Sequence, residues 1–145
     1  MNRAWRTVAL IAGILASLAI TTPAQADVQP ASCNSGERYL NAWVYVTEVG
    51  PHHHWEQFRY QLGGASTGGK SNVNFWVLEY NDTYSNAVTA YWNHSEDNLR
   101  TGPLYTVVPP WAVYTWGPTN ERTELQATFD IFGPDPQCDA ATVPV

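Results

Sequence analysis

The sequence is short of basic side chains. It contains 7 Lys and Arg residues against 13 Asp and Glu residues, which gives a formal net charge of −6 at pH 7. Proteins that bind nucleic acid carry clusters of Lys and Arg, and no such cluster occurs here. We therefore expect no nucleic-acid partner, and anionic membrane surfaces are disfavoured for the same reason. A neutral or cationic partner fits this charge better.

Long hydrophobic runs are also missing, with one short exception near the start. The apolar stretch 8–20 follows Arg3 and Arg6 and precedes the small-x-small triplet Ala-Gln-Ala at 24–26. A helix that spans a bilayer needs roughly 20 apolar residues, so this stretch is too short for a membrane anchor. The pattern is typical of a secretory signal peptide. We therefore expect cleavage of residues 1–26 and secretion of residues 27–145 as one extracellular domain without a membrane span.

Cysteine is scarce, because the chain contains only Cys33 and Cys138. The C-x-x-C spacing of redox-active thiols is absent. Two cysteines in an exported chain usually pair with each other. We therefore predict a disulfide between Cys33 and Cys138 that ties the start of the domain to its end as a structural crosslink.

Helical periodicity is absent beyond the proposed cleavage site. Apolar and polar residues alternate instead, which is the pattern of half-buried β-strands. In the segment 38–47, for example, an aliphatic row that includes Leu40 and Val44 lies opposite Trp43 and Tyr45. The segments with strand-like patterns are 38–47, 55–62, 73–80, 87–93, 104–108, 112–116 and 123–132.

Turn residues separate these segments, and about seven short strands predict an all-β protein. We expect a single-domain antiparallel β-sandwich, Ig-like or jelly-roll-like, with a barrel as the weaker alternative. The Pro-rich ends outside the two cysteines are expected to be loose, and the segment 95–98 is expected to be a turn. The protein is expected to be a monomer.

Residues 64–71, GASTGGKS, match the phosphate-binding loop pattern G-x-x-x-x-G-K-[ST]. That loop binds phosphate because it opens a helix whose N-terminus and backbone N–H groups converge on the ligand. The residues from Asn72 onwards are rich in Val and aromatics, which favour a strand over a helix. We therefore interpret the match as a mobile connection between two strands, and we expect no nucleotide and no other cofactor.

The histidines at 52–54 are candidate metal ligands, because imidazole binds zinc, copper and nickel. In an extended segment His52 and His54 point to the same side, and two ligands are too few for a closed site. A third ligand would have to come from His94 or Glu56, which the sequence does not place nearby. We interpret the segment as a polar hairpin tip and predict no physiological metal site.

Catalytic motifs are missing. No Ser lies in a G-x-S-x-G turn, and the spacing of a calcium-binding loop is absent. We interpret the adjacent acids Glu96 and Asp97 as solvated turn residues and not as an acid/base pair. These absences favour a non-catalytic protein, and a small secreted hydrolase or metal carrier is the third alternative.

Aromatic residues, in contrast, are abundant, with 7 Trp, 8 Tyr and 4 Phe. Strand alternation puts Trp43, Tyr45, Trp76 and Trp92 opposite rows of other apolar residues. If those rows form the core, the four rings face solvent, where aromatic rings stack on sugars or anchor protein interfaces. The alternative is that the rows face outwards, or that edges and loops cover the rings.

These observations predict a small secreted binding protein whose leading ligand is a glycan or cell-wall polymer. The candidate ligand-binding residues are Trp43, Tyr45, Trp76, Trp92 and Trp111. The alternative is a protein-binding module, such as an inhibitor of an extracellular enzyme, that uses the segment 107–111 as a rigid exposed loop. The expected partner is thus a carbohydrate polymer or an extracellular protein.

Overall fold

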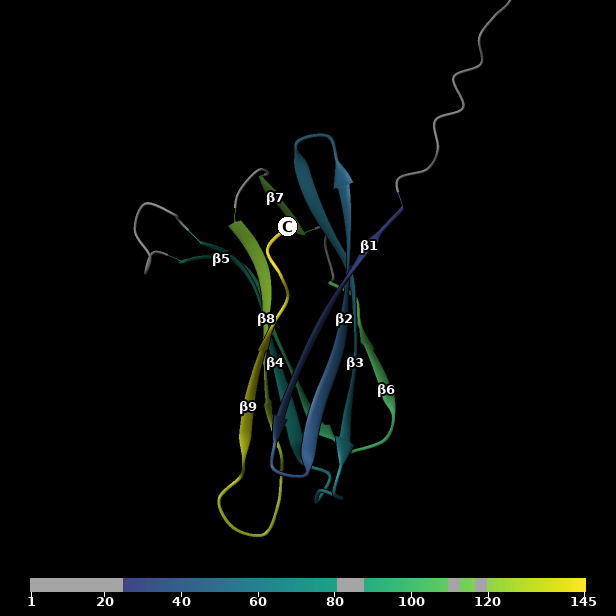
Figure 1. The fold of residues 1–145 in the computed structure, drawn as a ribbon, viewed down its shortest axis with the longest axis vertical. Helices are drawn as coiled ribbons and strands as arrows, with labels where there is room; N and C mark the ends of the chain where they lie inside the picture. The colour runs from purple at the N-terminus through teal and green to yellow at the C-terminus, as the bar shows by residue number, and fades with distance from the viewer. Residues whose placement is uncertain (1–24, 81–87, 110–112, 117–119) are drawn as a thin grey trace, which may run out of the picture.

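The computed structural model describes residues 25–80, 88–109, 113–116 and 120–145 (Figure 1). Every regular element in these ranges is a β-strand, and none of the described residues belongs to a helix that is long and apolar enough to cross a membrane. The strands are β1 (Asp27–Ser35), β2 (Arg38–Val49), β3 (His52–Gly64), β4 (Ser71–Tyr80), β5 (Val88–Leu99), β6 (Leu104–Val107), β7 (Val113–Trp116), β8 (Asn120–Thr128) and β9 (Gln137–Ala141).

The strands form two antiparallel sheets that pack face to face (Figure 1). Sheet A has the order β1-β2-β3-β6, and β7 pairs with β3 on the same edge as β6 but nearer the start of β3. Sheet B has the order β5-β4-β8-β9. The predicted antiparallel β-sandwich is therefore confirmed.

The alternation of β2 decides which face of sheet A is the inner one. Leu40 and Val44 are fully buried in the core, whereas Trp43 and Tyr45 on the opposite face are half-buried. The aliphatic row thus faces sheet B. Each Å² of apolar surface that this removes from water stabilises the fold by about 25 cal/mol. Of the two readings of this strand, the one with an inward aliphatic row is correct.

Aromatic rings fill the centre of the core. Phe58 stacks on Trp92 with 5.0 Å between ring centroids, and Phe75 meets Phe58 edge-on at 5.9 Å and Tyr60 edge-on at 5.1 Å. The expectation that Trp92 faces solvent is wrong, since only 6% of it is exposed. The segment around it has no aliphatic row to fix the inner face, so its contact with Phe58 decides the orientation.

The chain ends outside the cysteines are not loose, which corrects another expectation. β1 pairs with β2 along its whole length and β9 pairs with β8. Pro30 lies within β1, where proline is tolerated because β1 is an edge strand that needs hydrogen bonds on one side only. Pro30 therefore indicates an edge strand and not an unstructured tail.

The predicted turn at 95–98 is also wrong, because β5 continues through it to Leu99. Residues of this segment pair with β4, and the register shifts between Ser71 and Val73. Asn98 has a φ of 59°, a left-handed backbone that Asn adopts more readily than most residues. The polar residues of 95–98 thus belong to an irregular edge strand.

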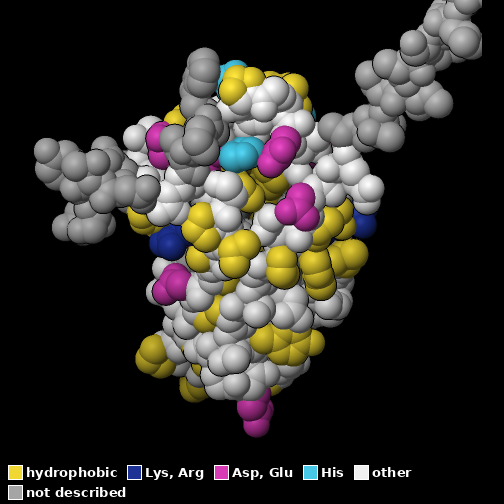
Figure 2. Space-filling view, turned by 45° about the horizontal axis from the view of Figure 1, so that its top comes forward, with side chains coloured by type: hydrophobic (Ala, Val, Ile, Leu, Met, Phe, Trp, Pro, Cys, Tyr) yellow, Lys and Arg dark blue, Asp and Glu magenta, His cyan; other side chains and the backbone are white. Residues whose placement is uncertain are grey.

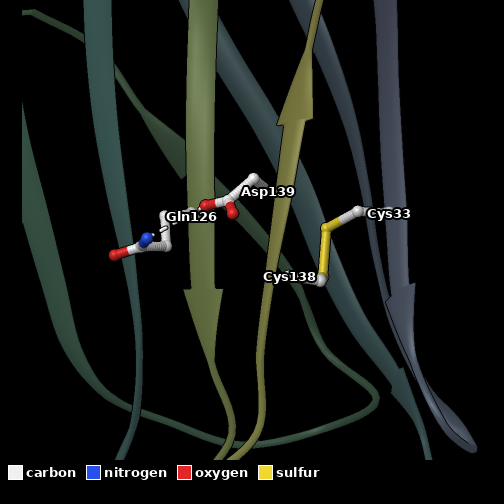
Figure 3. Close-up of a disulfide and its surroundings, with 4 residues drawn as sticks. All are labelled: Cys33, Gln126, Cys138 and Asp139. Atoms are coloured by element: carbon white, nitrogen blue, oxygen red, sulfur yellow. Dashed lines mark hydrogen bonds between the residues drawn. A yellow bond between two sulfur atoms is a disulfide. The ribbon is translucent and has the colours of Figure 1, made fainter.

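The predicted disulfide is confirmed (Figure 3). Cys33 in β1 and Cys138 in β9 are bonded, with their Cα atoms 5.7 Å apart. Because β1 is the edge of sheet A and β9 the edge of sheet B, the bond joins the two sheets along one side of the sandwich. Next to Cys138, the Gln126 amide donates a 2.9 Å hydrogen bond to the Asp139 carboxylate across β8 and β9.

Candidate functional site

The outer face of sheet A carries an aromatic pair, Trp43 and Tyr45, from neighbouring outward positions of β2. In the register of β2 and β3, Trp43 lies opposite Arg59 and Tyr45 lies opposite Gln57. The guanidinium carbon of Arg59 lies 5.3 Å from the centroid of the Tyr45 ring. Cation–π attraction holds the guanidinium against this ring and so positions it beside Trp43.

A hollow of about 410 Å³ opens beside the aromatic pair, and we call it the β3–β6 hollow. It is lined by Trp43, Tyr45, Arg59, Gln61 and Leu104. Within the described residues, Arg59 donates one hydrogen bond, from Nε to Gln57 at 3.0 Å, which leaves its terminal N–H groups available. The hollow therefore presents ring faces, a guanidinium and an amide within one small area.

The chemistry of this lining suits the binding of a ligand of mixed polarity. None of its five residues is a carboxylic acid, a histidine or a thiol, and its ionisable groups are the Tyr45 phenol and the Arg59 guanidinium. Aromatic rings and fixed N–H donors recognise a ligand that has both apolar faces and hydroxyl or carbonyl groups.

The remaining predicted aromatic residues do not join this pair. Trp76 is half-buried on the outer face of sheet B, where it lies in register with Asn93 and Glu124, on the opposite side of the sandwich. Trp92 is in the core. Trp111 lies outside the described residues. The five candidates are thus divided between two faces, the core and a segment that the structure does not describe.

The outer face of sheet B is organised differently, because its charged groups bind one another. The Arg122 guanidinium donates a 2.6 Å hydrogen bond to the Glu124 carboxylate and lies 4.0 Å from the centroid of the Tyr80 ring. It donates a further hydrogen bond of 2.6 Å to the Tyr80 hydroxyl, which itself donates to Glu124. These groups satisfy one another, so this face offers fewer free donors to a ligand than the β3–β6 hollow does.

The three adjacent histidines begin β3 directly after the hairpin turn. Their side chains alternate in direction, as in any extended strand. His54 stacks on Tyr114 at 4.7 Å, and His52 contacts the same ring edge-on at 6.3 Å. His53 points the other way, and its Nδ1 lies 2.8 Å from the buried carboxylate of Glu121. In the described part of the chain no three His, Cys, Asp or Glu residues are placed to hold a metal ion.

A groove of about 390 Å³ lies between β5 and β6 and contains the fourth histidine. His94 Nε2 lies 2.5 Å from the Glu96 carboxylate, and its ring stacks on Trp92 at 5.5 Å. Glu96 is therefore paired and belongs to β5, which corrects its interpretation as a turn residue, while its side chain stays 37% exposed and Asp97 is exposed. Burial and the charge of Glu96 raise the pKa of the buried Tyr60 hydroxyl, so Tyr60 stays neutral.

The segment that matches a phosphate-binding loop connects two strands, as predicted, since β3 ends at Gly64 and β4 begins at Ser71. Two of its backbone N–H groups donate hydrogen bonds to Asp130. The Lys70 N–H donates to the Asp130 carboxylate at 3.1 Å, and the Gly68 N–H donates to the Asp130 carbonyl at 2.9 Å. The loop is thus tied by Asp130 to the segment that follows β8, and a Cβ at Gly68 would lie 2.3 Å from the Asp130 carboxylate.

We expect that the Lys70→Ala variant melts at the same temperature as the parent protein, and that ATP with magnesium raises the melting temperature of neither. A ligand at a hundred times its dissociation constant stabilises the folded state by about 2.7 kcal/mol, which a thermal shift assay detects. Asp130→Ala serves as the control and should lower the melting temperature, because it removes a charged acceptor. A nucleotide-dependent shift that Lys70→Ala abolishes would refute this interpretation.

Arg59, Gln61 and Leu104 are site residues that the sequence analysis missed. Alternation predicts the outward direction of Arg59 and Gln61, because both lie between inward residues of β3. The pairing that sets Arg59 opposite Trp43 depends on the register of β2 and β3, which alternation alone does not reveal. Leu104 joins them only because β6 pairs with the other edge of β3.

Comparison with known proteins gives no match: no family model fits this chain, and no curated protein and no solved structure shows significant similarity to it. The function is therefore inferred from the geometry of the site alone.

Proposed function

We propose that this protein is a secreted, non-catalytic module that binds a glycan or cell-wall polymer through the outer face of sheet A. The observation that supports this is the aromatic pair Trp43 and Tyr45, half-buried opposite the core row and bordering a hollow with Arg59 and Gln61. Rings that a sheet holds in fixed positions bind with little loss of side-chain entropy.

The two kinds of groups in the hollow match the two kinds of surface on a sugar ring. The C–H face of a sugar packs against an aromatic ring, while its hydroxyl groups accept or donate hydrogen bonds at the rim. Arg59 supplies donors, and Gln61 supplies an amide that already donates to the Gly102 carbonyl at 2.5 Å and still has its own carbonyl as an acceptor.

The distribution of hydrophobic side chains on one face of the molecule supports a ligand of mixed polarity. On the face shown in Figure 2, hydrophobic side chains appear in separate groups with polar surface between them, and Lys and Arg side chains are few. A partner that buries one large apolar patch would require a more continuous area. The scarcity of cations also disfavours a strongly anionic polymer.

A protein-binding module, such as an inhibitor of an extracellular enzyme, is the second candidate. One observation favours it: Leu104 is 57% and Val108 is 62% exposed, at the beginning of β6 and just after its end. Exposed aliphatic side chains beside a segment that leads into two prolines suit insertion into the cleft of an enzyme.

The double variant Trp43→Ala with Tyr45→Ala is expected to stay folded and to lose glycan binding. Each ring contact contributes about 0.5–1.5 kcal/mol, so two lost rings weaken binding roughly 5- to 150-fold. Both rings are half-buried, so the loss in stability should stay below the roughly 3–5 kcal/mol of a core aromatic. The measurement is retention on insoluble chitin, cellulose, xylan and peptidoglycan, with a urea denaturation curve of the same samples.

Trp76→Ala is the matched control, because it removes a half-buried tryptophan from the outer face of sheet B. It should leave retention unchanged. If no polysaccharide retains the parent protein while it inhibits an enzyme in a panel of secreted proteases, the second candidate replaces the first. If the double variant unfolds, the two rings belong to the core and the proposal loses its main support.

A further inference from the structure

A second hollow adjoins Trp43 on the side away from Arg59, and we call it the β1–β2 hollow. Its volume is about 390 Å³, close to the 410 Å³ of the β3–β6 hollow. It is lined by Pro30, Ala31, Ser32, Asn41, Ala42, Trp43 and Ala141. Small side chains make this depression, and Trp43 borders both hollows, so its ring forms a ridge between them.

The strand register aligns the two hollows across the sheet. One row of paired outward residues runs Pro30, Trp43, Arg59 and Thr106 from β1 to β6. Neighbouring strands lie about 4.8 Å apart, so this row spans about 14 Å. A straight path at right angles to the strands therefore leads from the β1–β2 hollow over Trp43 into the β3–β6 hollow.

A second row of outward residues runs parallel to the first, two residues away along each strand. It consists of Ser32, Asn41, Gln61 and Leu104, which are paired in register from β1 to β6. The first row offers the pyrrolidine ring of Pro30 and the indole of Trp43 as apolar contacts. The second row offers one hydroxyl and two amides, which both donate and accept hydrogen bonds.

We infer that this face binds a linear polysaccharide laid across the strands, with sugar units in both hollows and the ring of Trp43 under the chain between them. This inference rests on the proposed glycan-binding function and specifies its ligand as an extended chain. A chain in this position places the faces of its rings on the row of Trp43 and its hydroxyl groups along the row of Asn41 and Gln61. A single sugar unit fills one hollow and leaves the other empty.

Length dependence is the first measurable consequence. Linked units in adjacent sites bind at high effective concentration, so each filled hollow multiplies the affinity. Isothermal titration with oligosaccharides of one to six units, prepared from whichever of chitin, cellulose and xylan retains the protein, should give an affinity for the hexamer at least tenfold higher than for the monomer. Equal affinities for monomer and hexamer would overturn the inference, while retention on the polymer would still support the proposed function.

A variant that fills one hollow gives the second test. Ser32 is an exposed residue of edge strand β1, where a tyrosine is a good strand former. Ser32→Tyr should fill the β1–β2 hollow and reduce the affinity for the hexamer about tenfold, to the value of a shorter oligomer, while binding of the dimer in the β3–β6 hollow stays unchanged. Asn34→Tyr is the matched control, because Asn34 is the next exposed, outward residue of β1 and does not line the hollow.

A smaller change keeps the test valid if the tyrosine disturbs β1. Asn41→Ser removes one amide from the second row without adding bulk, and it should lower the affinity for the hexamer more than that for the dimer. Full hexamer affinity in Ser32→Tyr, or in a folded Asn41→Ser variant, would show that the β1–β2 hollow does not bind the chain. A failure of every polysaccharide to retain the parent protein would instead refute the proposed function, and this inference with it.

Discussion

Loss of the Cys33–Cys138 disulfide is expected to lower the free energy of unfolding by about 4.7 kcal/mol. The bond closes a loop with a sequence separation of 105 residues. A crosslink reduces the entropy of the unfolded chain, and in the chain-entropy model this effect reaches about 4.7 kcal/mol for a loop of about 100 residues. Small domains have a net stability of only about 5–15 kcal/mol, so the bond contributes a large part of it.

The measurement is a urea denaturation curve of the double variant Cys33→Ser with Cys138→Ser beside that of the oxidised parent protein. The reduced parent protein should behave like the variant, and the reducing agent should leave the variant itself unchanged. A difference below about 1 kcal/mol would contradict the prediction. It would mean that the unfolded chain without the crosslink is less disordered than the chain-entropy model assumes.

Phe58→Ala is expected to lower the free energy of unfolding by about 3–5 kcal/mol, the usual cost of removing a large aromatic ring from a core. Only 1% of Phe58 is exposed, and its ring contacts Phe75 at 5.9 Å and Trp92 at 5.0 Å. These neighbours come from β4 and β5 of the opposite sheet, so the variant leaves a cavity between the two layers. The walls of such a cavity relax only in part.

Gln57→Ala is the control for this variant, since Gln57 precedes Phe58 in the chain and pairs with Tyr45 on the outer face. Its substitution should change the stability by about 0.5 kcal/mol or less. With roughly 4 °C per kcal/mol for a domain of this size, Phe58→Ala should melt about 12–20 °C below the parent protein. A fall of only a few degrees would show that the aromatic centre of the core is less tightly packed than the ring distances indicate.

Strict alternation of apolar residues predicts the inner face of a strand correctly. In β2 and β8 the aliphatic residues share one face, so the choice of that face as the inner one orients every side chain of the strand. Leu40, Val44 and Leu125 are buried as the pattern indicates. In β5 the pattern fails, because Tyr91 and Trp92 are adjacent and about equally apolar. Packing against Phe58 then selects Trp92 as the inner residue, and that contact is between residues far apart in the sequence.

The candidate site was predictable only in part, for a related reason. The outward direction of Trp43 and Tyr45 follows from local alternation, but the hollows around them depend on which strands are neighbours and on their register. Ser32 and Asn41 meet because β1 pairs with β2, and β1 is a strand that Pro30 concealed in the sequence. A shift of one strand by one residue along its neighbour would turn its side chains to the other face of the sheet.

The position of the disulfide has a mechanical consequence. Because Cys33 and Cys138 lie in the first and last strands, a pulling force applied to the two ends of the domain passes through the sulfur–sulfur bond. The chain between the two cysteines, which contains both hollows except for Pro30, Ala31, Ser32 and Ala141, then carries almost no tension. If one end is tethered and the other is pulled, only the short segments outside the bond can extend, so the β3–β6 hollow keeps its shape under load while the β1–β2 hollow does not.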